Sequence, residues 1–345
     1  MTRHVAIVGA GVAGCATAYG LGNADAEVTV FERRSEAGGR AATREREGCS
    51  YDVGANYLTA EDQRVQELVD GPLADDLVAV DGAVWTLDAD GEIAPGREDG
   101  ASKWTGRRGV ADLGTALLDR ADCDRRLDTD VAGLQRTGDG SWTLLAGTPL
   151  GDDAARAGPF DDVVLTPPAP VTAELLRDVP IADSLCAAAR SIEYRPITTV
   201  AARYDRALEW PYYALVDTSK TLDLGWIARE ECKPGHVPSD GSLVIIQASP
   251  EWSHRHRTAE DAVIADAATD VLARLLDDPA LADPRWTEVV RWKHALTDDV
   301  LAASVRREPA DAGLHVAGDW VAGESRLNAA IVSGLETADL LREQA

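Results

Sequence analysis

The chain has 345 residues, of which 45% are hydrophobic, and its formal net charge is −25 at pH 7. A protein of this charge repels phosphate backbones, so we expect no nucleic-acid partner. No apolar run approaches the roughly 20 residues that span a bilayer. The first expected strand begins next to Met1 and leaves no room for a signal peptide, so we expect a cytoplasmic protein with no membrane partner.

The acidic residues are dispersed along the chain, and its only lysines are Lys103, Lys220, Lys233 and Lys293. This composition resembles that of proteins from a high-salt cytoplasm, because a Debye length of roughly 3 Å at 1 M salt screens the self-repulsion. The five cysteines are scattered, with no Cys-x-x-Cys pair. They predict neither a redox pair nor a metal site.

A glycine-rich turn near the start organises the prediction. An apolar strand over residues 4–9 leads directly into Gly9-Ala10-Gly11-Val12-Ala13-Gly14. In a dinucleotide-binding fold the first glycine allows the tight turn, the second lets the backbone approach the pyrophosphate, and the third lets the helix pack closely on the strand. The phosphates then lie at a helix N-terminus, where free N–H groups and the helix dipole favour an anion.

The residues after this turn identify the dinucleotide. A second expected strand, 27–31, ends at Glu32, close to the spacing of about 20 residues at which a carboxylate bonds the ribose hydroxyls. Gly38-Gly39-Arg40 follows, and an arginine there can reach back to the pyrophosphate with a charge-assisted bond. Plain NAD domains do not need this arginine, whereas FAD-binding relatives commonly carry it. The cofactor is therefore predicted to be FAD, held non-covalently because no cysteine follows Cys232.

Further elements follow in chain order. The small pair Gly54-Ala55 lets backbone pass close to a flat ring, and Asn56 and Tyr57 offer polar groups to it. The patterns predict helices over 61–69 and 109–121, a hairpin between residues 78 and 93, strands over 130–135 and 141–145, a solvent loop over 147–158 and a buried strand over 162–166. Pro167, Pro168 and Pro170 are interpreted as a crossing into a second domain.

The later half reads as an antiparallel sheet with one helix on one side. The expected strands are 198–204, 212–216, 224–228, 243–248 and 287–292, and the helix is 259–276. A last apolar strand, 314–317, ends at Gly318-Asp319 before a helix over 327–341. Asp319 is expected to accept hydrogen bonds from ribityl hydroxyls. The backbone amides at the N-terminus of the last helix are expected to face the flavin edge, where negative charge gathers on reduction.

The predicted fold class is α/β, with a Rossmann-like FAD-binding domain and a second α+β substrate domain built on an antiparallel sheet. We assign residues 1–62, 103–170 and 300–345 to the first domain, and 63–102 and 171–299 to the second. The residues expected at the cofactor are Gly9, Gly11, Ala13, Gly14, Glu32, Arg33, Gly39, Arg40, Gly54, Ala55, Asn56, Tyr57, Val131, Gly318, Asp319, Leu327 and Asn328.

Several stretches together resemble the renalase family, especially its bacterial-type members, within the flavin-containing amine oxidase class. Beyond the glycine motifs, they include Asp52-Val53-Gly54-Ala55-Asn56-Tyr57-Leu58-Thr59-Ala60, Gly158-Pro159-Phe160-Asp161, Pro167-Pro168-Ala169-Pro170, Trp226-Ile227-Ala228-Arg229, Lys233-Pro234-Gly235, Ala248-Ser249-Pro250-Glu251-Trp252-Ser253, Arg291-Trp292 and Gly318-Asp319-Trp320. Asn56, Lys293-His294 and Asn328-Ala329 depart from the family pattern, which leaves the substrate open.

The resemblance implies an oxidase that takes a hydride from misreduced dihydronicotinamide isomers of NAD(P)H to flavin N5, with O2 as acceptor, giving NAD(P)+ and H2O2. The catalytic candidates are His294 and Tyr57. The substrate candidates are Trp226, Trp252 and Trp292 for a planar ring and Arg326 for a phosphate, while His254 and His256 are expected at the surface or capping a helix.

Two alternatives stay open. One is another flavin amine oxidase or a desaturase, acting on an amine for which Tyr212 and Tyr213 would supply an aromatic cage. The other is a non-catalytic FAD-binding protein. The expected partners are thus O2 and a small-molecule substrate, either a dinucleotide or an amine.

Overall fold

A computed structural model describes residues 2–22, 24–96, 102–147 and 155–344. One of its two main sheets is five-stranded and parallel, in the order β10-β2-β1-β14-β20. Its strands are β1 (Arg3–Val8), β2 (Ala26–Phe31), β10 (Cys123–Arg126), β14 (Asp162–Leu165) and β20 (Leu314–Val316). The apolar strands 27–31 and 162–166 expected from the sequence are both in this sheet, and 162–166 lies beside β1.

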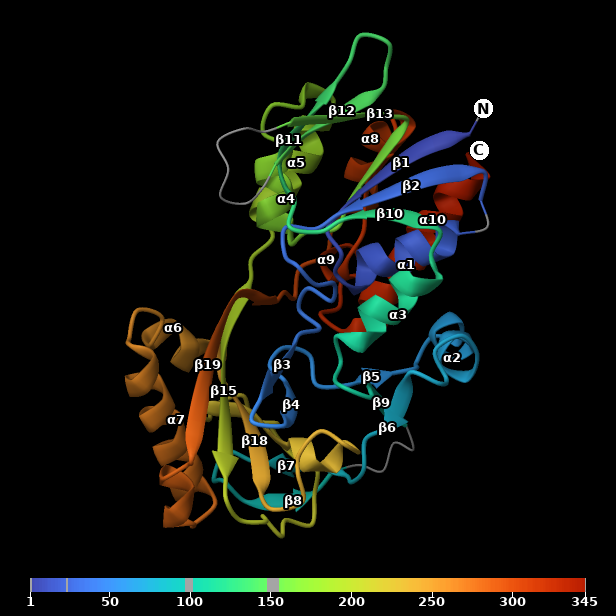
Figure 1. The fold of residues 1–345 in the computed structure, drawn as a ribbon. Coiled ribbons are helices and arrows are strands. Elements are labelled where there is room, and N and C mark those ends of the chain that lie inside the picture. The colour runs from blue at the N-terminus through green and yellow to red at the C-terminus, as the bar shows by residue number, and fades with distance from the viewer. Residues whose placement is uncertain (1, 23, 97–101, 148–154, 345) are drawn as a thin grey trace.

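Both faces of this parallel sheet are covered, which explains why residues 5–8 of β1 are all apolar. Val5 and Ile7 face a core shared with α1 (Val12–Leu21), α3 (Asp112–Arg120) and α10 (Leu327–Glu343). Ala6 and Val8 face a second core. That core includes α4 (Ala169–Leu175), α5 (Asp183–Ser191) and the antiparallel sheet of β11 (Asp130–Arg136), β12 (Trp142–Gly147) and β13 (Ala155–Phe160). Figure 1 shows the two groups on opposite sides of β1.

The second main sheet has seven strands, in the order β19-β15-β18-β17-β16-β7-β8. They are β7 (Val84–Leu87), β8 (Ile93–Pro95), β15 (Arg195–Tyr204), β16 (Ala214–Asp217), β17 (Leu224–Arg229), β18 (Ser242–Ala248) and β19 (Trp286–Leu296). The helices α6 (Pro250–Arg255) and α7 (Asp261–Leu275) cover one face of this sheet, and Figure 1 shows α7 beside the long strands β15 and β19.

The remaining elements are smaller. They are the hairpin β3 (Thr43–Arg46) and β4 (Cys49–Asp52), the sheet β5 (Leu58–Thr59), β9 (Lys103–Gly106) and β6 (Leu77–Ala79), and the helices α2 (Gln63–Asp70), α8 (Arg307–Asp311) and α9 (Asp319–Ala322). Short 3-10 helices cover Pro180–Ala182, Glu230–Cys232, Pro279–Ala282 and Ala303–Arg306. Among the described helices, none is both long and apolar enough to cross a membrane.

The predicted fold class is confirmed, with three corrections in detail. The second sheet is antiparallel except for one pair, because β7 from the early hairpin runs parallel to β16. In the expected loop 147–158, residues from Ala155 onward form β13 and pair with β12, and residues 148–154 lie outside the described part. The prolines at 167–170 do not take the chain across, because α4 and α5 pack on the parallel sheet as far as the buried Ile192.

Candidate functional site

A cavity of about 2320 Å³ lies between the two main sheets. Its walls come from the carboxyl ends of β1 and β2, the loop after β4, strands β7, β17 and β19, and the start of α10. All of the residues expected at the cofactor line it except Gly14. The cavity therefore collects residues from the whole length of the chain.

The three glycines of the turn after β1 have different surroundings. Gly9 has a φ of +100°, and a Cβ on it would lie 2.6 Å from Thr166 Oγ1. A Cβ on Gly14 would lie 2.0 Å from the carbonyl oxygen of Gly9, which explains how closely α1 packs on β1. A Cβ on Gly11 would meet nothing within 4 Å. Gly11 thus leaves open space beside the N-terminus of α1, where a pyrophosphate fits.

Glu32 stands at the end of β2 in the cavity wall. One carboxylate oxygen accepts from the backbone N–H of Ala10 at 2.8 Å, and the other accepts from Arg34 N–H at 2.9 Å. These bonds fix the side chain against the glycine turn. Since a carboxylate has about four acceptor positions, each oxygen keeps capacity for a ribose hydroxyl. Arg33 and Val131 line the same part of the cavity.

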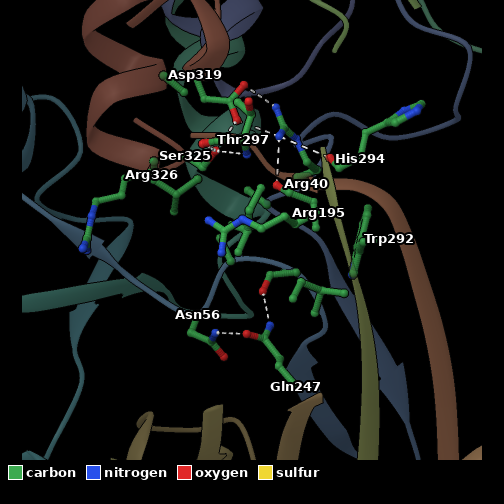
Figure 2. Close-up of a pocket in the computed structure, with 18 of the residues that line it drawn as sticks. Arg40, Asn56, Arg195, Gln247, Trp292, His294, Thr297, Asp319, Ser325 and Arg326 are labelled. Atoms are coloured by element: carbon green, nitrogen blue, oxygen red, sulfur yellow. Dashed lines mark hydrogen bonds and ion pairs between the residues drawn. The ribbon is translucent and has the colours of Figure 1, made fainter. Parts of the chain in front are cut away.

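The guanidinium of Arg40 lines the cavity and is held by an ion pair. It donates two bonds of 2.7 Å to the two carboxylate oxygens of Asp319 and one of 3.1 Å to the carbonyl of Ala295 (Figure 2). Burial opposes the charged form, but Asp319 holds the pKa of Arg40 above its ordinary value. This bidentate ion pair holds the guanidinium in the cavity wall. Its contact with the pyrophosphate stays a prediction.

The segment after β4 passes close to other backbone. A Cβ on Gly54 would lie 2.0 Å from the carbonyl oxygen of Arg40, so only glycine fits there. The Gln247 side chain donates to the carbonyl of Gly54 at 2.7 Å and accepts from Asn56 Nδ2 at 3.4 Å (Figure 2). Because a carbonyl only accepts, this series of hydrogen bonds fixes the orientation of both side-chain amides. Sequence reasoning missed Gln247, which reads simply as a strand residue.

Two of the three predicted tryptophans line the cavity. The ring of Trp226 lies 5.9 Å from the ring of Tyr57, and Trp292 donates from its indole nitrogen to the carbonyl of Val53 at 2.7 Å. Trp252 is 2% exposed and stacks on His256 within the core beside α6, so its predicted substrate contact is wrong.

The tyrosine cage considered for an amine is also not formed as predicted. Tyr212 and Tyr213 are buried in the cores of the second sheet, and neither lines the cavity. Burial raises the pKa of Tyr212 to about 12, with a smaller opposing effect from Arg229. The aromatic pair that lines the cavity is instead Tyr57 and Trp226.

The predicted residues near α10 and the end of β19 also line the cavity. Leu327 and Asn328 begin α10, whose first internal bond is donated by Ala330 to Arg326. Arg326 pairs with Glu324 at 2.7 Å.

The ring of His294 lies 5.4 Å from Tyr194 and extends away from Asn56 and Gln247 in Figure 2, which argues against the predicted catalytic contact.

A buried ionic cluster adjoins the cavity and was not predicted. The ammonium of Lys233 lies 2.7 Å from Asp52 Oδ2 and 2.7 Å from Glu230 Oε1, and His236 Nδ1 lies 3.3 Å from Glu230 Oε2. All four side chains are fully buried. Asp52, Glu230 and His236 are metal-ligand types, but here the ammonium of Lys233 pairs with both carboxylates. The cluster anchors the end of β4 at Asp52, two residues before Gly54.

Comparison with known proteins identifies the family of the chain. A model of the NAD(P)-binding Rossmann-like domain matches residues 7–71. The model described as flavin containing amine oxidoreductase matches residues 96–342, most of the chain. The chain belongs to the flavin-containing amine oxidoreductase family. The open space at Gly11, the acid at Glu32 and the size of the cavity fit FAD, the cofactor that the family implies.

Individual relatives match this chain over a short stretch or at low identity. The mitochondrial protoporphyrinogen oxidase of Nicotiana tabacum is 41% identical over 68 residues, 20% of this chain and 14% of that protein. The chloroplastic protoporphyrinogen oxidase 1 of Spinacia oleracea is 24% identical over 260 residues, 69% of this chain and 45% of that protein. The matches thus span less than half of these relatives.

Solved structures of the same fold cover the whole chain. The putative protoporphyrinogen oxidase of Exiguobacterium sp. 255-15 has a TM-score of 0.80 at 16% identity, and each chain is covered completely. Cyclohexylamine oxidase of Brevibacterium oxydans has a TM-score of 0.72 at 16% identity, with 100% of this chain and 99% of that chain covered. At these identities the comparison shows a shared fold and does not identify a substrate.

Proposed function

We propose that this family member is a renalase-like oxidase, which takes a hydride from misreduced dihydronicotinamide isomers of NAD(P)H and gives NAD(P)+ and H2O2 with O2 as acceptor. FAD, when bound, supplies the hydride acceptor and returns the electrons to O2. Loss of a hydride restores the aromatic nicotinamide ring, so the reaction needs no base. The protein's contribution is then to position the ring and exclude water.

The volume of the cavity carries this proposal. A single small-molecule site ordinarily occupies about 300–1,000 Å³. The cavity here is about 2320 Å³, which leaves room for a second molecule of dinucleotide size beside FAD. A small amine would leave much of that volume unfilled.

The residues of the cavity wall have simple roles in this proposal. Tyr57 and Trp226 offer flat surfaces for the nicotinamide ring, and Trp292 is fixed in place through Val53. Gln247 holds Asn56 and the Gly54 carbonyl in one arrangement. These contacts orient a ring, and none of them requires a proton to move.

An amine substrate is the second candidate. The family's name and the fold shared with cyclohexylamine oxidase favour it. Its binding would use Tyr57 and Trp226 as an aromatic pair around the amine, in place of the two tyrosines expected from the sequence.

The test is anaerobic flavin absorbance of the FAD-loaded protein in molar salt. The protein is mixed with 2- and 6-dihydronicotinamide isomers, with ordinary NADH and with a panel of amines. Rapid bleaching by the isomers, but not by NADH or amines, is the expected result. Bleaching by an amine alone would establish the second candidate, and no bleaching by any of them would refute both.

A further inference from the structure

The chain places its few lysines in two locations only. Lys103, Lys220 and Lys293 line the cavity. The fourth, Lys233, is fully buried between Asp52 and Glu230. Every other basic residue is arginine. Ammonium groups that a ligand can reach are therefore found at the cavity.

The charge balance of the cavity wall also departs from that of the chain. Its described residues include ten Lys or Arg and eight Asp or Glu, whereas the whole chain has 34 and 59. Most of these acids already accept bonds from backbone amides or arginines, namely Glu32, Asp217, Asp223, Asp298, Asp319 and Glu324. The cavity wall thus has two more basic than acidic side chains, in a strongly acidic protein.

Lys103 and Lys220 border the part of the cavity formed by the second sheet. The ammonium of Lys103, at the start of β9, lies 5.9 Å from the centre of the Tyr57 ring, which in turn faces Trp226. Lys220 is exposed in the loop between β16 and β17, and the carboxylate of Asp217 holds this loop by accepting from three of its backbone amides. Within the described part of the chain, neither lysine forms an ion pair.

We infer that Lys103 and Lys220 select an anionic substrate, one with a planar ring for Tyr57 and Trp226 and a phosphate or carboxylate group for the two ammonium groups. This inference rests on the proposed function and names the charge of its substrate. A lysine ammonium is a compact charge with three rotatable donors, which suits a phosphate, and it repels a protonated amine. The FAD pyrophosphate does not account for these lysines, because its glycine turn belongs to the other sheet.

The experiment compares NAD+ with nicotinamide riboside, which shares the nicotinamide ring and its ribose but lacks the two phosphates and the adenosine. Binding to FAD-loaded protein is followed by the change in flavin absorbance, with inorganic pyrophosphate as a competitor. K103M and K220M are each expected to bind NAD+ about tenfold more weakly, since a bond to a charged group is lost. Binding of the riboside stays unchanged, and the weakening of NAD+ binding diminishes in molar salt.

R156M is the matched control. Arg156 is exposed on β13, away from the cavity, and its replacement removes the same single charge from the protein. This variant should bind both ligands as the wild type does. The ratio of flavin to protein absorbance checks that every variant retains FAD.

The outcomes separate the two proposals. Unchanged binding of NAD+ and pyrophosphate in both lysine variants would overturn the inference, and so would an equal loss for the riboside, since the lysines would then shape the cavity without recognising charge. Weakened pyrophosphate binding combined with no oxidation of dihydronicotinamide isomers would refute the proposed function and leave the anion site standing.

Discussion

Replacement of Lys233 tests the buried ionic cluster beside the cavity. In K233M the carboxylates of Asp52 and Glu230 lose the ammonium that lies 2.7 Å from each, and both remain fully buried. Removing one partner of a buried ion pair costs about 3–5 kcal/mol, because the remaining charge is uncompensated. Asp52 also accepts bonds from Val110 N–H and from Thr43 and Thr105, so the loss extends to β3, β9 and the start of α3.

The loss of stability in K233M should depend on pH, because His236 titrates in the same cluster. Burial lowers the pKa of His236, but Glu230 and Asp52 outweigh it, and the net shift is upward from 6.5. A raised pKa in the folded state gives stability that is complete below the unfolded value and is lost as pH rises through the folded one. Lys233 opposes this shift, so in its absence the pKa of His236 rises further and the imidazolium replaces part of the missing charge. The variant should therefore lose more stability at about pH 9 than at about pH 6.

The assay is urea unfolding of FAD-loaded protein at fixed salt, since urea leaves the ionic strength unchanged. K220M is the control, because it removes an exposed lysine that forms no ion pair within the described residues. We expect a change below about 0.5 kcal/mol for it. A loss below about 1 kcal/mol for K233M at both pH values would contradict the reasoning and show that the cluster rearranges to keep its charges solvated.

Three further predictions concern cofactor and salt. G11A should unfold like the wild type but retain FAD at least about tenfold more weakly. G14A should lose more than about 2 kcal/mol of unfolding free energy, because only a Cβ at Gly14 would meet backbone. Equal unfolding midpoints for the two variants would contradict this. D319N should lower the ratio of bound flavin to protein and cost about 2–3 kcal/mol of unfolding free energy, since one carboxylate oxygen paired with Arg40 is lost. Normal retention of FAD on gel filtration would show that the pair of Arg40 and Asp319 is not needed to hold FAD. The melting temperature should fall as salt is reduced from molar to millimolar, because the net charge of −25 is then unscreened; an unchanged melting temperature would refute this.

Local patterns predicted the elements that depend on neighbours in sequence. The strand, glycine turn and helix at the start, the acid at Glu32 and the buried strand β14 could all be predicted because each is specified within about 30 residues. The prolines at 167–170 misled the prediction because proline was interpreted as a break. Here Pro170 lies in the first turn of α4, where its missing N–H has no cost.

Contacts between distant segments could not be predicted in the same way. Arg40 and Asp319 are 279 positions apart, and no local pattern indicates that they form an ion pair. Trp226 and Trp252 look alike in the sequence, and only the packing of α6 against the second sheet buries Trp252. The role of Lys233 was missed for the same reason, since its partner Asp52 lies 181 positions away.

The location of the lysines has a practical consequence for chemical modification. Reagents that acylate lysine side chains label most proteins over their whole surface. In this protein Lys233 is shielded, so the accessible side-chain amines are the three at the cavity. A fluorophore attached through lysine therefore becomes a reporter of ligand occupancy, and coupling to a solid support should use the abundant surface carboxylates, which leaves the cavity open.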